Sequence, residues 1–394
     1  MPMGEFWVNY YHVWCWSTSK LSASAAHTYG RKYVGAESFT SEMKDAAWIN
    51  HPYSLKALGD YFYTRGINRF VLNDFAHQPW VGLKPGMTAG PWGCQLNRGN
   101  TWWEQSTAWI SYISRCQHML QSGQFVADLC YYFGENVPNT LVREDKLQPV
   151  PPKGFDYDGF VTDILMKFKI ENGKFVLPSG MQYRVMVLPH FERTMRIEVL
   201  QKIEELVRAG GIIVGPKPLR SPGLSNYPGC DRQVQTLAEK IWGNTNGKNK
   251  TSQSYGKGRV YWGVNLEQVF SDLHIQPDFK YPDNGDFKIE YIHRRSEDAD
   301  IYFISNQRHC FESLECSFRQ VGKVPEIWDP QTGNINKIAK YREQNGQTEI
   351  TLLLAPAESA FVVFRKPVVN HKHVIEAEHN TQSIFNISDQ DQPV

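Results

Sequence analysis

A carboxylate stands near the end of a short strand-like segment, "KYVGAESFT", residues 32–40. The run of aromatic, β-branched and small residues before Glu37 favours a strand, and the polar residues after it favour a turn. In enzymes built on a parallel barrel, the catalytic side chains lie at the carboxyl ends of the strands. Glu37 is therefore a candidate catalytic residue. The competing interpretation is a solvated loop carboxylate or a cap for a following helix.

A second polar cluster follows the next predicted strand, residues 67–77. Asn73, Asp74, His77 and Trp80 lie at and beyond its carboxyl end. Amide, imidazole and indole groups together suit a sugar, because they offer hydrogen bonds to hydroxyls and a flat face to the ring. We therefore expect these four residues to bind substrate. The alternative is a structured loop whose polar groups satisfy one another.

A tryptophan pair lies farther along, in the glycine-rich stretch 90–106. Adjacent residues on a helix point about 100° apart, so one of Trp102 and Trp103 can pack inward while the other lines a cleft. Both are candidate substrate-binding residues. The alternative is that both belong to the core.

Strands and helices alternate in the first part of the chain. We predict helices at 21–30, 51–66 and 101–123, each ending at a glycine, and strands at 32–40 and 67–77. This alternation is typical of a parallel α/β sheet or barrel. Nine of the twelve tryptophans lie in residues 1–109, and the change of composition afterwards suggests another domain.

Two further regions follow. A second α/β unit is predicted from strands at 124–135, 183–191 and 211–218 and a helix at 193–211, with a polar loop at 244–256. From about residue 286 short strands separated by turns indicate a β-sandwich, with strands at 300–307, 312–320, 348–356 and 359–366.

The second α/β unit looks like a glutamine-amidotransferase-type domain. An active domain of that type needs a Cys nucleophile on a strained glycine-rich elbow. No G-x-C-x-G occurs, and Cys230 falls in a predicted loop. We therefore interpret this domain as structural and not as an amidase.

The bulk composition excludes several classes of protein. Lys and Arg number 42 and Asp and Glu number 41, so no basic face for nucleic acid is implied. No apolar run reaches the ~18 residues that span a membrane. The seven cysteines are scattered and form no C-x-x-C pair, which indicates neither a zinc site nor a disulfide framework.

These pieces together resemble a known family. "SAAHTYGRKYVGAESFT", "SLKALGDYFYTRGINRFVLN", "GPWG" and "NTWW", with "VADLCYYFGENVP" downstream, look like glycoside hydrolase family 106, the α-L-rhamnosidases. The resemblance covers residues 1 to about 367. It implies the C-terminal part of a (β/α)₈ barrel at 1–124, an amidotransferase-like, non-catalytic α/β domain at 125–275, a β-sandwich at 276–368 and a tail at 369–394.

The resemblance also implies a mechanism. The family releases terminal α-L-rhamnose from plant or bacterial glycans by inversion, using two glutamates, and has been associated with an active-site calcium. By analogy with the related family 42, the strand carrying Glu37 is the seventh of the barrel, so Glu37 is the expected general base. The general acid is then expected on strand 4, upstream of Met1, so we expect the natural protein to be longer and this chain alone to lack one of the two catalytic carboxylates.

Other residues keep roles in this interpretation. Glu5 and Glu135 are fallback acids, and His27 and His77 are expected to be partners of sugar hydroxyls or neighbours that tune Glu37. No calcium ligand is assigned, although Asp74 is a candidate. The full-length family is periplasmic or secreted. Two alternatives stay open: a non-catalytic carbohydrate-binding or scaffold fragment, and a lyase or another glycosidase specificity on the same fold.

Overall fold

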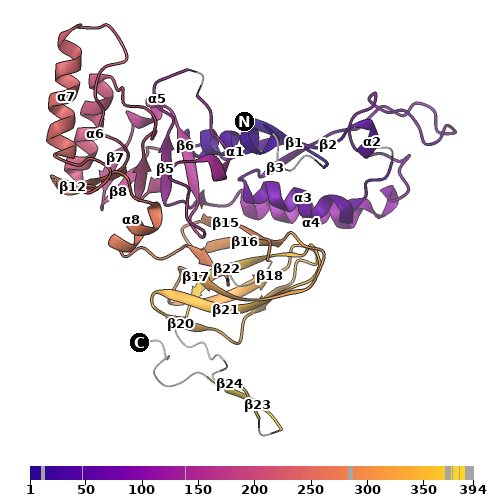
Figure 1. Ribbon diagram of the computed structural model, residues 1–394. Helices are drawn as coiled ribbons and strands as arrows, with labels where there is room; N and C mark the ends of the chain where they lie inside the picture. The colour runs from indigo at the N-terminus through magenta and orange to yellow at the C-terminus, as the bar shows by residue number, and fades with distance from the viewer. Residues whose placement is uncertain are drawn as a thin grey trace. The chain divides into compact units, whose positions relative to one another are not determined.

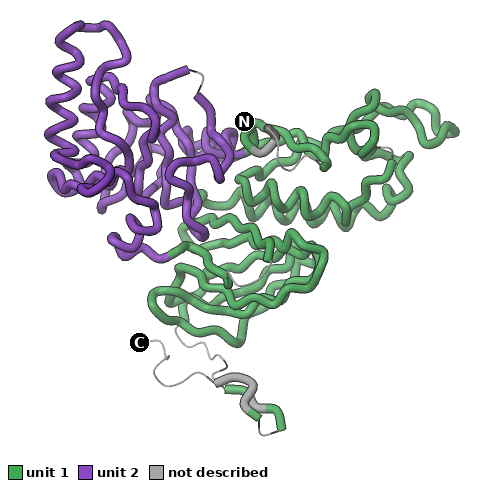
Figure 2. The backbone as a smooth tube through the Cα atoms, viewed as in Figure 1, with its two compact units in different colours: residues 1–19, 33–125, 277–394 green, residues 20–32, 126–276 purple. Residues whose placement is uncertain are grey.

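The computed structural model shows a mixed α/β, multi-domain fold (Figure 1). It describes residues 1–9, 14–46, 48–137, 139–282, 287–368, 374, 376–380 and 382–386. The chain forms two compact units, shown in Figure 2: residues 1–19, 33–125 and 277–394, and residues 20–32 and 126–276. The described residues include no helix long and apolar enough to cross a membrane.

The first unit begins with a small parallel sheet. Its strands, in the order β1-β2-β3, are β1 (Met3–Trp7), β2 (Gly35–Thr40) and β3 (Arg69–Leu72). The helices of this region are α1 (Trp14–Thr28), which ends in the second unit, α2 (Met43–Ala46), α3 (Pro52–Thr64), the 3₁₀ turn η1 (Trp103–Gln105) and α4 (Ser106–Leu120). Helices α3 and α4 run beside each other along one side of the strands (Figure 1).

Aromatic residues hold this sheet to its helices. Phe6 of β1 stacks on Phe62 of α3 with ring centroids 4.3 Å apart, and Tyr63 stacks on Phe70 of β3 at 4.3 Å. Phe39 at the end of β2 meets Phe6 and Phe70 edge-on. Burial of such rings contributes about 2–3 kcal/mol each before entropy costs. Because this face of the strands packs on α3, the other face of the sheet is held in a fixed position.

A buried lysine joins α3 to the C-terminal sandwich within the same unit. Lys56 Nζ donates to Asp60 Oδ2 at 2.6 Å, to the Ala357 carbonyl at 2.8 Å and to Ser359 Oγ at 2.9 Å. The hydroxyl of Tyr112 on α4 donates to Asp60 and contacts Ser359 Oγ. A buried charge tolerates displacement poorly, so this network fixes α3 and α4 against the sandwich.

The sandwich consists of two antiparallel sheets with a shared apolar core. The first sheet has the order β14-β17-β21-β20 and the second the order β19-β18-β22-β16-β15-β4. The strands are β4 (Gln124–Phe125), β14 (Phe279–Lys280), β15 (Ile289–Arg295), β16 (Asp300–Asn306), β17 (Glu312–Phe318), β18 (Lys323–Trp328), β19 (Ile335–Lys337), β20 (Arg342–Gln344), β21 (Gln347–Leu354) and β22 (Ser359–Pro367). A separate hairpin follows, β23 (Glu376–His379) with β24 (Gln382–Asn386).

The second unit is a six-stranded sheet in the order β12-β13-β11-β10-β5-β6, parallel except for β12. A small antiparallel sheet, β7-β8-β9, accompanies it. The bounds are β5 (Leu129–Tyr132), η2 (Glu144–Lys146), β6 (Tyr157–Phe160), α5 (Thr162–Leu165), β7 (Lys169–Glu171), β8 (Lys174–Val176), β9 (Gln182–Tyr183), β10 (Val185–Val187), α6 (Ile197–Ala209), β11 (Ile212–Val214), α7 (Gly229–Trp242), β12 (Ser252–Tyr255), β13 (Gly258–Tyr261) and α8 (Leu266–Asp272).

Three local predictions are wrong. The polar stretch 244–256 was expected to be a loop, but its end forms β12, because pairing with β13 supplies partners that its polar composition concealed. The predicted strand 124–135 divides into β4, which pairs with β15, and β5, which joins the parallel sheet. Cys230 lies in the first turn of α7 rather than in a loop, and it is buried.

Candidate active site

Glu37 lies on β2 with one carboxylate oxygen held by two neutral donors. Thr40 Oγ1 donates to Glu37 Oε1 at 2.6 Å, and Asn73 Nδ2 donates to the same oxygen at 2.7 Å. In the described part of the chain no donor reaches Oε2. The side chain is neither buried nor fully exposed. Glu37 is therefore oriented through one oxygen while the other can accept a proton or a hydrogen bond.

The strand register brings a second glutamate beside the first. Glu5 on β1 pairs with Glu37 on β2, which pairs in turn with Val71 on β3. Residues in register on neighbouring strands share one face of a sheet, so both carboxylates belong to the face opposite Phe6 and Phe70. Trp7 Nε1 donates to Glu5 Oε2 at 2.8 Å.

An irregularity in β2 explains the Thr40 contact. The register slips between Phe6 and Trp7, so that Trp7 pairs with Thr40 and Phe39 is the extra residue. Without it, side-chain alternation would place Thr40 and Glu37 on opposite faces of the strand. Phe39 takes a left-handed backbone, φ 63°, and its ring enters the core. The bulge thus turns the Thr40 hydroxyl back towards Glu37, a local effect that strand propensity does not reveal.

The loop that contains Cys94 fixes Asn73. The Cys94 amide donates to the Asn73 carbonyl at 2.9 Å, and the Gly93 amide donates to the Ser41 carbonyl at 3.0 Å. Gly93 has φ +83°, and a Cβ there would overlap Asn73 Oδ1 and lie 2.9 Å from Asp74 Oδ1. Only glycine therefore lets this loop close over the two side chains that follow β3.

Asp74 differs from Glu37 in its surroundings. Burial raises the pKa of Asp74, against the smaller opposing effect of the backbone N–H of Ala89. Neither carboxylate oxygen makes a hydrogen bond of ordinary geometry within the described part of the chain. A carboxyl in this setting favours the neutral form more than an exposed one does.

Calcium requires six to eight oxygen ligands. Within the described ranges, no three Asp, Glu, His or Cys side chains gather as metal ligands would. Asp74 alone does not form such a site. The described residues therefore do not fit a calcium ion by themselves, and calcium stays a prediction from the family resemblance.

The remaining predicted residues of this region have varied surroundings. His77 is exposed, and the indole of Trp80 is 59% exposed. Trp102 Nε1 donates to the Asn50 carbonyl at 2.9 Å, and its ring meets Trp109 edge-on. These contacts support a packing role for Trp102. Trp103 begins η1 and is partly buried. Contacts thus join only Asn73 directly to Glu37, and substrate binding by the others stays a prediction.

Two predicted residues belong to the second unit. His27 Nδ1 lies 3.0 and 3.1 Å from the two oxygens of Asp158, in a buried pair. Burial alone would raise the pKa of Asp158, but the His27 charge and hydrogen bond lower it. Glu135 accepts hydrogen bonds from the backbone N–H and the Nε of Arg196, the residue that precedes α6. These contacts support structural roles for His27 and Glu135.

Sequence reasoning missed a tryptophan pair beside the carboxylates. Trp7 and Trp92 lie edge to face with ring centroids 5.7 Å apart. The glycines of "GPWG" around Trp92 were a visible signal, since paired glycines allow a loop to hold one bulky residue in a fixed place.

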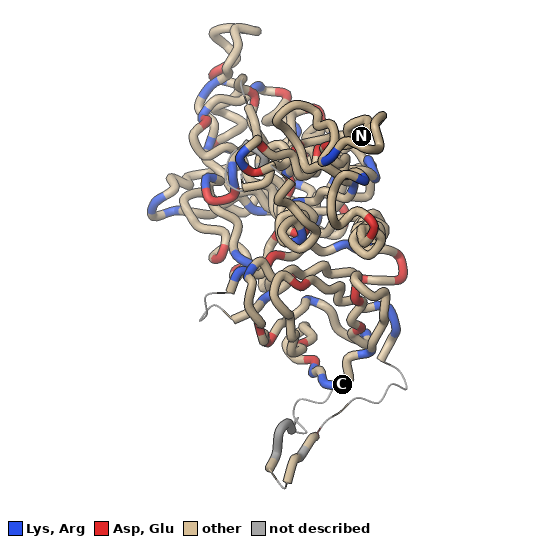
Figure 3. The backbone as a smooth tube through the Cα atoms, turned by 90° about the vertical axis from the view of Figure 1, so that its right-hand side faces the viewer, with Lys and Arg blue, Asp and Glu red and all other residues tan. Residues whose placement is uncertain are grey.

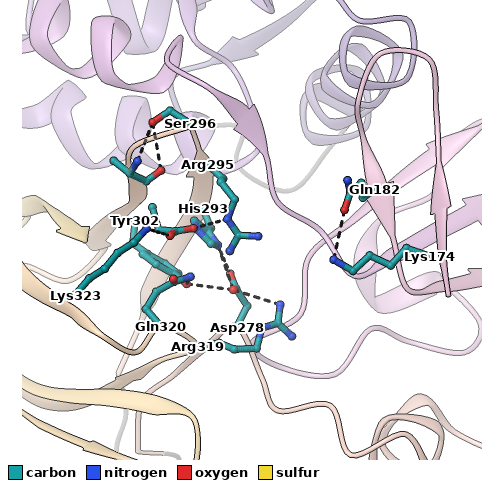
Figure 4. A network of polar contacts seen from close by, with 12 residues as sticks. Lys174, Gln182, Asp278, His293, Arg295, Ser296, Tyr302, Arg319, Gln320 and Lys323 are labelled. Atoms are coloured by element: carbon teal, nitrogen blue, oxygen red, sulfur yellow. Dashed lines mark hydrogen bonds and ion pairs between the residues drawn. The ribbon is translucent and has the colours of Figure 1, made fainter. Parts of the chain in front are cut away.

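The sandwich also contains a buried charged cluster that the sequence did not predict (Figure 4). His293 of β15 contacts Asp278 through Nδ1 at 2.9 Å and Asp300 through Nε2 at 3.2 Å. Arg295 and Lys323 pair with Asp300 at 2.5 and 2.9 Å. Both imidazole nitrogens are occupied and the ring is fully buried. With both of its nitrogens paired and its ring buried, the imidazole is placed to stabilise the sandwich, which supports a structural role for this cluster.

Acidic and basic residues are spread over the whole of the described chain. Figure 3 shows acidic and basic positions interspersed along the tube of the chain. The nearly equal totals of 42 basic and 41 acidic residues agree with this distribution.

Comparisons with known proteins relate these features to a family. The family described as alpha-L-rhamnosidase, glycoside hydrolase family 106, matches residues 1–343. A curated relative from Formosa agariphila, named "Putative beta-glucuronidase", is 36% identical over 377 residues, which cover 95% of this chain and 30% of that protein.

Solved structures agree. The rhamnosidase from Novosphingobium sp. PP1Y matches with a TM-score of 0.86 and 30% identity, over 96% of this chain and 36% of that one. A GH42 beta-galactosidase from G. stearothermophilus matches with a TM-score of 0.54 and 9% identity, over 92% of this chain and 59% of that one, a likeness of fold alone. The chain thus spans about a third of the length of the curated relative and of the rhamnosidase, and it belongs to the α-L-rhamnosidase family, glycoside hydrolase family 106.

Proposed function

We propose that this chain carries part of the active site of a glycosidase that releases terminal α-L-rhamnose from plant or bacterial glycans. The observation that carries the proposal is Glu37, a half-buried carboxylate on a parallel strand whose one oxygen is fixed by Thr40 and Asn73. Membership of the rhamnosidase family supports the reaction class.

Glu37 acts as the general base in this proposal. A base must be oriented towards the water it activates, and it must keep an acceptor oxygen available. The two donors to Oε1 set the orientation of the carboxylate, and Oε2 faces the reacting water. Activation of that water opposite the leaving group inverts the anomeric centre.

The register makes Glu5 a poor general acid for inversion. In-register residues on neighbouring strands stand about 4.8 Å apart at Cα. Glutamates this close on neighbouring strands can bring their carboxyls within the ~5–5.5 Å found in retaining enzymes, whereas inverting enzymes keep them ~6.5–9.5 Å apart. We therefore propose that the acid lies on a strand other than β1–β3, and that Glu5 helps to bind the sugar.

The proposal includes a larger barrel of which β1–β3 are a part. Met3 and Val71, on the face that carries Glu5 and Glu37, are 52% and 42% exposed. Further strands would cover these apolar side chains and supply the acid. The low share of the relatives' length supports this proposal.

The test measures hydrolysis and stereochemistry together. The chain, alone and joined to the remaining barrel strands of its natural protein, is assayed on 4-nitrophenyl α-L-rhamnoside and 4-nitrophenyl β-D-glucuronide. We expect the joined protein to cleave the rhamnoside and not the glucuronide. The β anomer of rhamnose should appear first by NMR. Cleavage of the glucuronide alone would favour the activity in the name of the curated relative, and an α anomer as first product would assign a retaining mechanism to Glu5 and Glu37.

A non-catalytic carbohydrate-binding or scaffold chain is the alternative function. It predicts sugar binding with no turnover even when all barrel strands are present, and with no effect of Glu37→Gln. The paired assay of wild type and Glu37→Gln decides between the two.

A further inference from the structure

We infer that Trp92, set edge-on against Trp7, is the stacking platform that selects the apolar face of the sugar at the Glu37 site. The inference rests on the proposed function. It names the part of the substrate that this residue recognises, the ring C–H face and the methyl group of a 6-deoxy sugar. Neither tryptophan stood among the residues expected from sequence to bind substrate.

The first line of contacts runs through β1. The Trp92 ring meets the Trp7 ring at 5.7 Å with an interplanar angle of 73°. Trp7 Nε1 donates to Glu5 Oε2 at 2.8 Å, and Glu5 is in register with Glu37. Trp92 is therefore two contacts from the carboxylate beside the proposed base.

The second line of contacts runs through the loop. Gly93, the next residue, donates its amide to the Ser41 carbonyl at 3.0 Å, just beyond β2. Its α-carbon packs so closely on Asn73 that a methyl group there would overlap Asn73 Oδ1. Asn73 is one of the two donors to Glu37 Oε1. The first path thus ties Trp92 to Glu5 and the second ties it to Glu37, the two glutamates that are in register on β1 and β2.

The exposure of Trp92 distinguishes a platform from a core residue. Its side chain remains 46% exposed although Trp7 supports one flank. Trp102, in contrast, donates its indole N–H to Asn50 and packs on Trp109. A rigid indole with a free face, next to carboxylates and an amide, suits a ligand with an apolar face and a hydroxylated rim.

Sugar binding by the full chain tests the inference without requiring turnover. Methyl α-L-rhamnoside is titrated into wild type, Trp92→Ala, Trp92→Phe and Phe311→Ala, with binding followed by NMR. Covering roughly 60 Å² of indole corresponds to about tenfold in affinity. We expect that loss for Trp92→Ala, a loss within about threefold for Trp92→Phe, and none for Phe311→Ala, which removes an exposed ring of the sandwich.

Specificity supplies the second readout. L-mannose has a hydroxymethyl group where L-rhamnose has a methyl group, so wild type should prefer the rhamnoside over methyl α-L-mannoside. Trp92→Ala should lose most of that preference, whereas a mere loss of packing would weaken both sugars equally. The inference would be overturned if Trp92→Ala weakened the affinity for both sugars equally or left binding unchanged. It would also be overturned if the tenfold loss of affinity occurred in Trp80→Ala instead.

The outcomes separate this inference from the proposed function. If sugar binding depends on Trp92 but the completed barrel hydrolyses nothing, the proposed hydrolase function is refuted and the stacking role of Trp92 stands. Hydrolysis that depends on Glu37, with an unchanged KM in Trp92→Ala, would keep the hydrolase and refute the platform.

Discussion

Glu37 and His293 both lie on β-strands of the same compact unit, but their surroundings differ in kind. Glu37 is half-buried, accepts from two uncharged donors, and keeps one oxygen available. His293 is fully buried, with an aspartate on each nitrogen and further cations around those aspartates. A group with spare hydrogen-bonding capacity can act on a substrate, whereas a fully compensated group can only stabilise the fold.

The comparison also bears on pKa values. Burial alone would lower the pKa of His293, but Asp278 and Asp300 raise it. Burial alone would raise the pKa of Asp278, but His293 and Arg319 lower it. Perturbed pKa values often mark active sites, yet the shifted pKa values of His293 and Asp278 belong to a structural cluster. The availability of a free atom distinguishes the two regions better than the size of a shift does.

The largest effect is expected at Glu37. Glu37→Gln keeps the hydrogen-bonding shape but removes the base, which typically contributes 10²–10⁴-fold. We expect hydrolysis of an aryl α-L-rhamnoside by the completed barrel to fall by that factor, with an unchanged thermal unfolding curve. Glu104→Gln, at an exposed glutamate, is the control. Activity of the Glu37 variant within about threefold of wild type would remove Glu37 from the mechanism.

Asp278→Asn should destabilise the sandwich at the His293 cluster and leave the Glu37 site unaffected. Removing one member of a buried ion cluster leaves the remaining charge uncompensated and costs about 3–5 kcal/mol. We expect faster hydrogen exchange of the β15 and β16 amides and a lower unfolding midpoint, but sugar binding at the Glu37 site within about twofold. Glu349→Gln, which breaks an exposed pair with Arg342, should change stability by less than about 1 kcal/mol. Equal effects of the two variants would refute the structural role of the cluster.

Gly93→Ala should lower the activity that depends on Glu37 while leaving the carboxylate itself in place. The new methyl group overlaps Asn73 Oδ1, and the left-handed backbone adds strain of about 1–3 kcal/mol. Displacing Asn73 takes a donor away from Glu37, so we expect kcat to fall roughly tenfold. Gly82→Ala is the matched control, because nothing lies within 4 Å of its Cβ position. If both variants keep wild-type kcat, Asn73 does not position the base.

The smallest effect is a pH dependence of sandwich stability. The raised pKa of His293 stabilises the fold fully below its unfolded value near 6.5, and this contribution is lost as pH rises through the higher folded value. The lowered pKa of Asp278 stabilises the fold above its unfolded value near 3.8, and this contribution is lost as pH falls below it. The opening free energy of the β16 amides, obtained from hydrogen exchange corrected for intrinsic rates, should therefore be largest between about pH 4 and 6.5.

His293→Gln should remove the alkaline part of that dependence, because glutamine does not titrate. A wild-type protein whose β16 exchange, corrected for intrinsic rates, gives the same opening free energy at pH 6 and pH 9 would show that His293 is not charged in the folded state.

Short-range patterns determined most of the elements. Apolar spacing with Pro52 near the start and Gly66 beyond the end predicted α3, and the apolar centre of the predicted strand 67–77 predicted β3. The alternation of strands and helices predicted the α/β class. Glu37 and Asn73 could be nominated because each follows or ends a strand, and the structure joins them by a hydrogen bond. Local propensity and a period of two or 3.6 residues carry that much information.

Tertiary structure alone decided the rest. A bulge at Phe39 turned Thr40 towards Glu37, and the register of β1 on β2 placed Glu5 beside it; both depend on pairing between residues more than 30 positions apart. His27 packed against Asp158, 131 positions away, and His293 paired with two aspartates at the core of the sandwich. The sequence shows which side chains can do chemistry, but burial and pairing across the fold decide whether an atom of each remains free to do it.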